Sequence, residues 1–324
     1  MTSITHYTTF GVPAYAQSII PIDNESAITP ACFAQPFLVM GGGSNFLFVH
    51  PFAGNVILMR IKGRRVEHFA DCVHVHVAAG ESWHETVQWA VEQGYGGIEN
   101  LALIPGTVGA APVQNIGAYG VELQEVLVSV RAYHIPTGQW QVLERADCRL
   151  GYRDSVFKRQ QGVYLITSVT LRLTKHHHHY ATHYGPLQHL ERPDLRSIFE
   201  EVVAIRQQKL PDPAKIGNAG SFFKNPIIAQ VTYQALLKRY PTMPHFSTPG
   251  EGKVKVPAAF LIEQAGFKGY TVDERYGVSP VQPLVLVHYR DATGPEIWGL
   301  AQRVIQAVKE QFGILLEPEV NVVL

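Results

Sequence analysis

The chain carries two glycine-rich loops whose residue types suit the binding of a diphosphate. The first consists of Gly41, Gly42, Gly43, Ser44 and Asn45. Glycines can adopt positive φ and bring successive backbone N–H groups close to a ligand. Such amides form a concave nest for phosphate oxygens, and the side chains of Ser44 and Asn45 can add hydrogen bonds. These five residues therefore predict a phosphate-binding turn.

The second loop has the same character and is longer. It contains Pro105, Gly106, Thr107, Val108, Gly109, Ala110 and Ala111, and it is extended by Asn115, Gly117 and Gly120. Neither loop matches the G-x-G-x-x-G fingerprint of nicotinamide dinucleotide sites, and neither has the lysine of a P-loop. A single glycine cluster is more often only a turn. Two clusters, each beside a strongly apolar element, favour a diphosphate cofactor.

Hydrophobic periodicity predicts the elements that position these loops. Strands are expected at 37–40, 47–49, 56–58, 73–77, 163–173, 283–288 and 315–323. Helices are expected from a capping box at Ser82 and Glu85 to Gly94, and at 198–209, 260–264 and 297–312. The stretch 104–120 has no period, and so long a loop in a compact domain is usually functional. Strands and helices mixed without strict βαβ repetition predict an α+β fold.

Composition limits the function classes. A chain of 324 residues suits two or three domains, and Lys+Arg equals Asp+Glu at 27 each. A net charge of zero argues against nonspecific nucleic-acid binding. We expect no signal peptide, no membrane span and a reducing, cytoplasmic location. The scattered Cys32, Cys72 and Cys148 are expected to be buried small hydrophobes, with no metal site.

Five motifs in order give the sequence a resemblance to a known family. They are Gly41–Asn45, Ile104–Ala111, Tyr152–Ser155, Gly217–Pro226 and Leu316–Val320. This ordered set resembles the UDP-N-acetylenolpyruvoylglucosamine reductase family, of the type with a longer loop and a substrate-covering tyrosine. The likeness runs from Phe10 to Val320.

The resemblance implies an architecture and a reaction. It implies an FAD-binding fold of the vanillyl-alcohol-oxidase (PCMH) type in two subdomains, 1–65 and 66–208. A smaller C-terminal α/β substrate-binding domain would follow at 209–314, with a last strand at 315–324 returning towards the flavin domain. FAD would be bound without a covalent link, by the two glycine-rich loops. NADPH would supply the hydride, a UDP-sugar would be the substrate, and the protein would be a monomer active in peptidoglycan biosynthesis.

Three residues match the family's catalytic positions. Arg153 would grip the substrate carboxylate, Ser221 would donate a proton to the α-carbon, and Glu319 would be the acid near the reacting carboxylate. From the residues alone, Arg153 could instead cap a turn with Asp154, and Ser221 could bond its local backbone. Alternation along a strand cannot separate Glu319 from Glu317, since both lie on one face.

Four further residues match binding positions. Tyr184 would cover the substrate, and Lys209, Asn225 and Gln282 would meet the sugar nucleotide or the NADPH diphosphate. For Lys209 a solvated lysine at a helix end is nearly as good an interpretation. The sequence departs from relatives around 273–276 and at His288, where relatives often have asparagine. The run 176–179 of four histidines is expected to be solvated rather than a metal site.

Two other functions remain open from the sequence. Another flavoenzyme of the same fold could oxidise an alcohol or a sugar with O₂, but it should lack the serine motif at 217–226. A non-catalytic sugar-nucleotide-binding protein should have lost the three catalytic positions.

Overall fold

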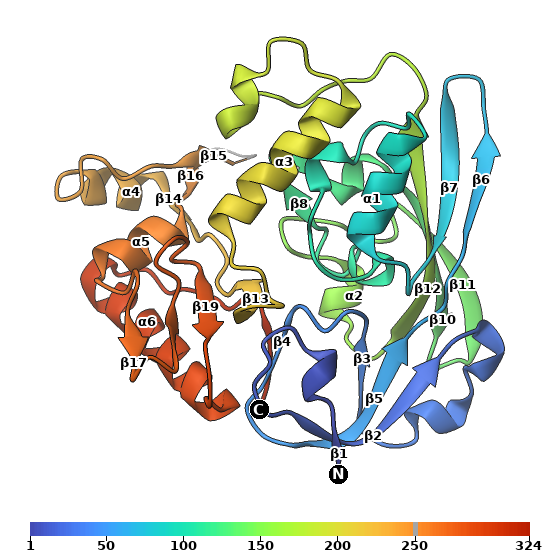
Figure 1. The fold of residues 1–324 in the computed structure, drawn as a ribbon, viewed down its shortest axis with the longest axis horizontal. Helices are drawn as coiled ribbons and strands as arrows, with labels where there is room; N and C mark the ends of the chain where they lie inside the picture. Colours follow the sequence, from blue (N-terminus) through green and yellow to red (C-terminus); the bar gives the residue numbers. More distant parts are fainter. Residues whose placement is uncertain (249–251) are drawn as a thin grey trace. The chain divides into compact units, whose positions relative to one another are not determined.

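The computed structural model describes residues 1–248 and 252–324, which divide into two compact units (Figure 1). Unit 1 comprises Met1–Thr2, Ala16–Gly43 and Ala53–Gln208. Unit 2 comprises Ser3–Tyr15, Ser44–Phe52 and Lys209–Leu324. The four-part division expected from the sequence stays a prediction.

Unit 1 is built on two sheets. The larger is antiparallel, with the order β11 (Gln139–Glu144), β10 (Leu127–His134), β12 (Tyr164–Thr174), β7 (Cys72–Ala78) and β6 (Arg64–His68). The smaller has the order β1 (Thr2–Ser3), β2 (Tyr15–Ile22), β5 (Phe52–Met59) and β3 (Phe37–Met40), with β3 and β5 parallel. In β7 the valines are buried while His74 and His76 are only partly buried, because alternate residues face opposite sides of a sheet.

The helices of unit 1 follow the predicted periodicity. Helix α1 (Trp83–Glu92) begins where the Ser82 hydroxyl accepts a hydrogen bond from the amide of Glu85, at 3.3 Å. Gly94, just after the end of the helix, has a left-handed φ of 73°, which lets the chain turn away. Helix α3 (Leu195–Lys209) buries Ile198, Val202 and Ile205 along one stripe. Unit 1 also contains α2 (Val156–Arg159) and short 3₁₀ turns at Glu99–Leu101, Val108–Ala110, Leu123–Glu125 and Gly185–His189.

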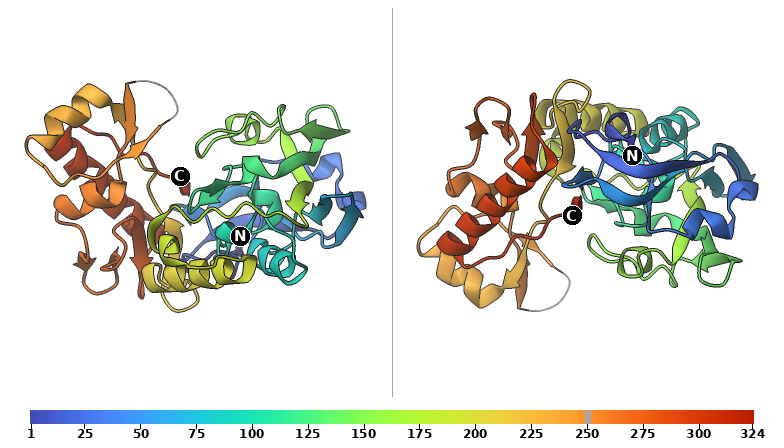
Figure 2. Two further views of the ribbon diagram at one scale, coloured as in Figure 1. Left: turned by 90° about the horizontal axis from the view of Figure 1, so that it is seen from above. Right: turned by 90° about the horizontal axis from the view of Figure 1, so that it is seen from below.

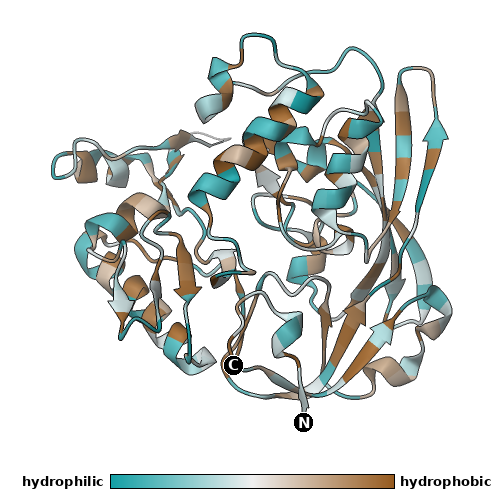
Figure 3. Ribbon diagram, in the orientation of Figure 1, coloured by the Kyte–Doolittle hydropathy of each residue, from teal (hydrophilic) through white to brown (hydrophobic). Residues whose placement is uncertain are grey.

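Unit 2 contains three small sheets. One is antiparallel, with the order β13 (Gly217–Ser221), β19 (Val285–His288), β18 (Tyr276–Val278) and β17 (Thr271–Val272). A second has the order β14 (Ile227–Ala229), β16 (Lys253–Lys255) and β15 (Phe246–Ser247). In the third, β20 (Asn321–Val323) runs parallel to β4 (Phe46–Phe48). In Figure 3, β19 is coloured as hydrophobic for most of its length, which fits its buried valines and leucine.

The helices of unit 2 cover these sheets. They are α4 (Gln230–Leu237), α5 (Ala258–Gln264) and α6 (Gly294–Phe312). Helix α6, the long red helix of Figure 2, packs against α5, β18 and β19. It begins at a capping box formed by Thr293 and Glu296 and ends at Gly313 in the left-handed conformation. Among the residues that the structure describes, no helix is both long and apolar enough to cross a membrane.

One predicted strand is wrong over most of its length. The segment 315–323 forms a strand only at Asn321–Val323. The residues before it make one isolated bridge, between Phe223 and Pro318. Pro318 has no N–H to donate, so a regular ladder cannot pass through it. The sequence predicts that Glu317 and Glu319 share one face of a strand. The structure shows that neither residue lies in a strand.

Candidate active site

In unit 1 the two glycine-rich loops lie against one another. A Cβ built on Gly41 would lie 2.1 Å from the hydroxyl oxygen of Thr107, and one on Gly42 would lie 3.1 Å from the Cα of Gly106. Side chains at these glycines would fill the space between the loops. Gly43 and Gly106 have φ of 61° and 111°, which favours glycine. The structure thus builds from the two predicted loops one cradle lined by backbone, which fits a dinucleotide cofactor.

The second loop is tied to the start of helix α1. The amide of Trp83 donates to the carbonyl of Gly106 at 3.0 Å, and the amide of Val108 donates to the carbonyl of Glu81 at 2.9 Å. The amide of Gly109 donates to the carbonyl of Ala79 at 2.9 Å, and a Cβ on Gly109 would clash with Ala79 at 2.5 Å. The cradle is therefore held by a strand end and a helix start, which are rigid elements.

Arg153 is held against the far end of the second loop. Its guanidinium donates to the carbonyl oxygens of Gly117 at 2.9 Å and Asn115 at 3.5 Å. The neighbouring Asp154 carboxylate accepts from Arg159 and from the amide of Ser155. The structure thus brings Arg153 together with two residues predicted to bind the cofactor.

The side chain of Asn115 shapes this loop from inside the protein. It is fully buried and donates to the carboxylate of Glu122 at 2.9 Å and to the carbonyl of Gly151 at 3.0 Å. Its oxygen accepts from the amide of Gln124 at 3.0 Å. Asn115 and Arg153 have left-handed φ of 42° and 53°, a conformation that costs a non-glycine residue energy and is concentrated at functional sites.

Arg206 is a functional candidate that the sequence reasoning missed. Its Nε donates to the carbonyl of Leu103 at 3.2 Å, and its guanidinium lies close to the side chain of Tyr119. Burial lowers the pKa of Arg206, and the charge of Arg153 lowers it further. In the described part of the chain, no carboxylate forms an ion pair with Arg206. A partly buried guanidinium with no acid beside it can stabilise an anionic ligand.

Tyr184 contacts Tyr119, which lies close to Arg206, through its aromatic ring. Its ring meets the ring of Tyr119 edge-on, with centroids 5.9 Å apart. Burial raises the pKa of both phenols, although the whole Tyr184 residue remains 41% exposed. The carbonyls of Tyr119 and Ala181 both accept from the side-chain amide of Asn100, at 3.0 and 2.8 Å. Asn100 therefore links the segment that carries Tyr184 to the second loop.

In unit 2, Ser221 ends strand β13 opposite Val285 of β19. The residue is partly buried. Its hydroxyl makes no hydrogen bond to any residue in 1–248 or 252–324, so the alternative role of bonding the local backbone is not seen. The hydroxyl thus keeps its hydrogen-bonding capacity for a ligand.

Glu319 lies beside Ser221 in unit 2 because the two segments pair through their backbones. The amide of Glu319 donates to the carbonyl of Phe222 at 2.7 Å, and the amide of Lys224 donates to the carbonyl of Glu317 at 2.9 Å. The side chain of Glu317 is exposed and forms an ion pair with Lys224 at 3.0 Å. The structure thus separates the two acids: Glu317 faces Lys224, and Glu319 is partly buried next to the serine segment.

Asn45 connects the first loop to this pair. Its side-chain amide donates to the carbonyl of Glu319 at 3.3 Å, and its carbonyl accepts from the amide of Asn321 at 3.0 Å. A residue predicted to bind the cofactor and one predicted to be catalytic are therefore in direct contact within unit 2.

The other predicted binding residues of unit 2 are not brought together. Asn225 uses its side-chain oxygen to accept from the amide of Ala258 at 2.9 Å. Gln282 has its side-chain oxygen near the amide of Leu284, at 3.5 Å. Lys209 is exposed at the end of α3, as the solvated-lysine interpretation expects. The role of these residues in substrate binding stays a prediction.

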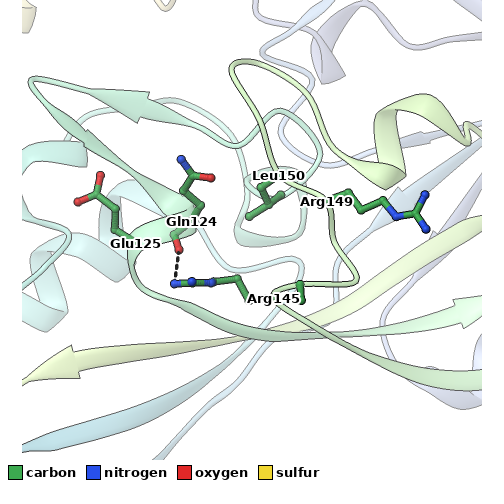
Figure 4. Close-up of a pocket in the computed structure, with 6 residues that line it drawn as sticks. Gln124, Glu125, Arg145, Arg149 and Leu150 are labelled. Atoms are coloured by element: carbon green, nitrogen blue, oxygen red, sulfur yellow. Dashed lines mark hydrogen bonds between the residues drawn. The ribbon is translucent and has the colours of Figure 1, made fainter. Parts of the chain in front are cut away.

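The described residues also form a shallow cavity of about 400 Å³ in unit 1 (Figure 4). It is lined by Gln124, Glu125, Arg145, Ala146, Arg149 and Leu150. Two of its charged side chains already form hydrogen bonds with the backbone: Arg145 donates to the carbonyl of Gln124, and Glu125 accepts from the amide of Glu122. None of the predicted site residues lines it, so we do not place the active site there. Within the described ranges, no cluster of His, Cys, Asp and Glu is arranged to hold a metal ion.

Comparison with known proteins first gives the class. Residues 26–144 match the family model of an FAD binding domain, which contains both glycine-rich loops. Residues 212–323 match the model of the UDP-N-acetylenolpyruvoylglucosamine reductase C-terminal domain. The chain is thus a flavoprotein with an FAD-binding domain followed by a reductase C-terminal domain.

Full-length relatives then give the family. A UDP-N-acetylenolpyruvoylglucosamine reductase of Amoebophilus asiaticus is 49% identical over 88% of this chain and 86% of its own length. The protein of that name from Pasteurella multocida is 43% identical over 99% of this chain and 96% of its own. The chain belongs to the UDP-N-acetylenolpyruvoylglucosamine reductase family, and the resemblance inferred from the five motifs is confirmed.

A solved structure supports the fold. The crystal structure of UDP-N-acetylenolpyruvylglucosamine reductase from Thermus caldophilus matches with a TM-score of 0.67 at 23% identity, covering 99% of this chain and 97% of that chain. The predicted α+β class with an FAD-binding fold is confirmed.

Proposed function

We propose that this protein is an FAD-dependent oxidoreductase that uses NADPH to reduce the enolpyruvyl group of UDP-N-acetylenolpyruvoylglucosamine, giving UDP-N-acetylmuramate for peptidoglycan synthesis. Family membership supports the reaction. The structural observation that carries the proposal is the pairing of the Ser221 segment with Glu319. That pairing puts the segment that carries Ser221 beside the segment that carries Glu319 in the C-terminal domain.

The cradle between the two glycine-rich loops fits FAD. Gly41, Gly42 and Gly106 would let backbone amides approach the diphosphate, and Thr107, Ser44 and Asn45 would add polar contacts. When bound and reduced, FAD supplies the hydride that adds to the β-carbon of the enol ether. The chain has to manage the charge and the proton that this addition requires.

Arg153 would bind the substrate carboxylate. Hydride addition to the β-carbon moves an electron pair onto the α-carbon and the carboxylate, so negative charge increases there. A guanidinium that is already oriented by the carbonyls of Gly117 and Asn115 needs little reorganisation to stabilise this charge. Its planar donors also match a carboxylate in two parallel hydrogen bonds.

Ser221 would deliver the proton to the α-carbon, which completes the reduction of the double bond. A serine hydroxyl is a weak acid and has to be positioned and electrostatically assisted to donate. Glu319 would supply that assistance in its protonated form or by sharing a proton, because two charged carboxylates at one place repel each other.

Binding of the sugar nucleotide or of the NADPH diphosphate would involve Lys209, Asn225 and Gln282, with Tyr184 covering the substrate. We further propose that residues 1–208 hold FAD in two subdomains and that residues 209–314 form the substrate-binding domain. The protein would act in the cytoplasm as a monomer, and it would not bind nucleic acid.

Purification and product analysis test this function. The protein should be yellow and should convert NADPH and UDP-N-acetylenolpyruvoylglucosamine to a product two hydrogens heavier, measured by mass spectrometry. A colourless protein that cannot be reconstituted with FAD would contradict the proposal. Consumption of O₂ with an alcohol or sugar, and none with the enolpyruvyl nucleotide, would show an oxidase instead.

A further inference from the structure

Strand β13, which carries Ser221, is irregular one residue before the serine. Asn218 stands opposite Val287 of β19, and Ser221 stands opposite Val285. Ala219 and Gly220 together therefore occupy the interval that Leu286 alone occupies on β19. This one-residue excess is a β-bulge, a feature that re-aims a side chain and is frequent next to active sites.

The bulge decides the face on which Ser221 lies. In a regular strand, side chains alternate, so a residue three positions after Asn218 would face the opposite side. The extra residue cancels this change and returns Ser221 to the face of Asn218. The next backbone contact fixes the register, because the amide of Phe222 donates to the carbonyl of Leu284 at 2.7 Å.

Gly220 makes the bulge possible. Its φ is 67°, in the left-handed region, where a side chain costs roughly 1–2 kcal/mol. A Cβ built on Gly220 would meet nothing within 4 Å. The constraint at this position is thus conformational and not steric.

Asn218 holds the bulge in place. Its side-chain oxygen accepts from the amide of Gly220 at 2.9 Å, an Asx turn that spans the bulge. Its amide group donates to the carbonyls of Pro211 at 3.0 Å and Ile216 at 2.9 Å. The residue is only 4% exposed, so these bonds are formed away from solvent, where they are costly to lose.

A second segment of unit 2, which contains Thr9, forms hydrogen bonds with the backbone of Asn218. The amide of Asn218 donates to the carbonyl of Thr9 at 3.0 Å, and the Thr9 hydroxyl donates to the carbonyl of Asn218 at 2.7 Å. His288 of β19 pairs with Gly217 and has its Nδ1 3.1 Å from the carbonyl of Phe10. The start of β13 is therefore fixed on several sides, while the bulge leads directly to Ser221.

We infer that Asn218 and Gly220 are positioning residues for proton donation by Ser221: the Asx turn maintains the bulge that aims the serine hydroxyl. This inference rests on the proposed function. It predicts that the geometry of β13 matters for the step in which the enolpyruvyl substrate is reduced, and not for the reduction of the flavin by NADPH.

The test compares Gly220→Ala with Gly313→Ala in the FAD-loaded enzyme. Gly313 lies in the same unit at the end of α6, with φ 69° and open space around a built Cβ, so both variants introduce the same backbone strain. Both should lower the melting temperature by a similar amount, about 2–4 °C. The two half-reactions are measured separately by anaerobic stopped-flow absorbance of the flavin.

Gly220→Ala should slow re-oxidation of the flavin by the enolpyruvyl nucleotide by about tenfold to a hundredfold, and the solvent deuterium isotope effect on that step should increase. Reduction by NADPH should change less than about twofold, and Gly313→Ala should leave both steps unchanged. Hydrogen exchange at residues 217–222 should accelerate in Gly220→Ala, which reports the loosened bulge without any turnover.

Asn218 variants complete the series. Asn218→Ala should behave like Gly220→Ala, and Asn218→Ser should recover part of the rate, because a serine can also accept from the amide two residues on. Equal half-reaction rates in Gly220→Ala and Gly313→Ala would overturn the inference and leave the proposed function intact. If the wild-type enzyme is not re-oxidised by the enolpyruvyl nucleotide, the proposed function fails, and the inference fails with it.

Discussion

The backbone amide of Glu319 donates a hydrogen bond to the carbonyl of Phe222 at 2.7 Å, which places Glu319 beside the residue that follows Ser221. The two segments are almost a hundred positions apart in the sequence. Their pairing continues one step further, where Lys224 binds Glu317 through both backbone and side chain. This arrangement gives the two acids of the Glu-Pro-Glu sequence different environments.

The first prediction separates the two acids. Glu319→Gln should lower the rate of flavin re-oxidation by the enolpyruvyl nucleotide by roughly 10²-fold, because it removes the acid that assists Ser221. Glu317→Gln should change that rate less than about threefold, and should change the free energy of unfolding by less than about 1 kcal/mol, since the Glu317 side chain in the ion pair with Lys224 is largely exposed. Stopped-flow absorbance and urea unfolding measure the two quantities. The reverse order of effects would assign the acid role to Glu317.

The second prediction concerns the proton donor. Ser221→Ala should leave reduction of the flavin by NADPH unchanged within about twofold and slow re-oxidation by the substrate by about 10²–10⁴-fold, the range expected for loss of a general acid. The mutated side chain makes no hydrogen bond within the described ranges, so the melting temperature should not change. Equal loss of both half-reactions would remove Ser221 from the proton-donor role.

The third prediction concerns Arg206. Arg206→Met removes a partly buried cation that has no acid as an ion-pair partner among the described residues, so an anionic ligand should lose affinity. We expect FAD or the sugar nucleotide to bind at least about tenfold more weakly, measured by flavin fluorescence and by isothermal titration. Arg196→Met on the same helix is the control, because Arg196 pairs with Glu200 at an exposed position. Unchanged affinity for both ligands in Arg206→Met would contradict an anion-binding role.

The fourth prediction is a pH dependence of stability at His84. Burial lowers the pKa of His84 from its ordinary value of 6.5, and its Nδ1 accepts from the amide of Leu103 at 3.0 Å. The folded protein therefore favours the neutral imidazole. Its contribution to stability should be complete above about pH 6.5 and should be lost as the pH falls from there towards the lower folded pKa.

Melting temperatures between about pH 5 and pH 8 test this dependence in the wild type and in His84→Gln. The glutamine keeps an acceptor oxygen but cannot be protonated, so its curve should be flatter over the acidic part of this range. The difference between the two curves isolates His84 from the other histidines. Parallel curves would contradict the assignment.

Elements with a local pattern could be predicted from the sequence. The valines of β7 alternate, and the apolar residues of α1 and α6 repeat with the helical period, so each element needs only its own residues to be recognised. The strands of two or three residues in unit 2, such as β15 and β17, were missed because so short a segment has no period. Their pairing depends on partners far away in the sequence.

The candidate site divides in the same way. The glycine-rich loops were found because glycine at these positions has a direct physical use, and the structure packs the loops together. The choice of Glu319 over Glu317 depended on the family motif alone until Lys224 was seen to hold Glu317. Pro318 explains why the strand predicted around them does not form.

Arg206 was overlooked although the sequence contained a signal. It follows Val202 by four residues, so the helical period places it next to the buried stripe of α3. Its contact with Tyr119 could not be predicted, because Tyr119 lies in a loop with no period and has a left-handed φ of 48°. Contacts of this kind depend on the tertiary structure.

Anaerobic re-oxidation of the reduced protein by its proposed substrate tests the central claim most directly. The yellow protein is first bleached with one equivalent of NADPH in the absence of oxygen, and UDP-N-acetylenolpyruvoylglucosamine is then added while the flavin absorbance is recorded. The proposed function predicts rapid return of the oxidised flavin spectrum and formation of UDP-N-acetylmuramate. A protein that stays bleached with this nucleotide and regains its colour only when air is admitted would contradict it.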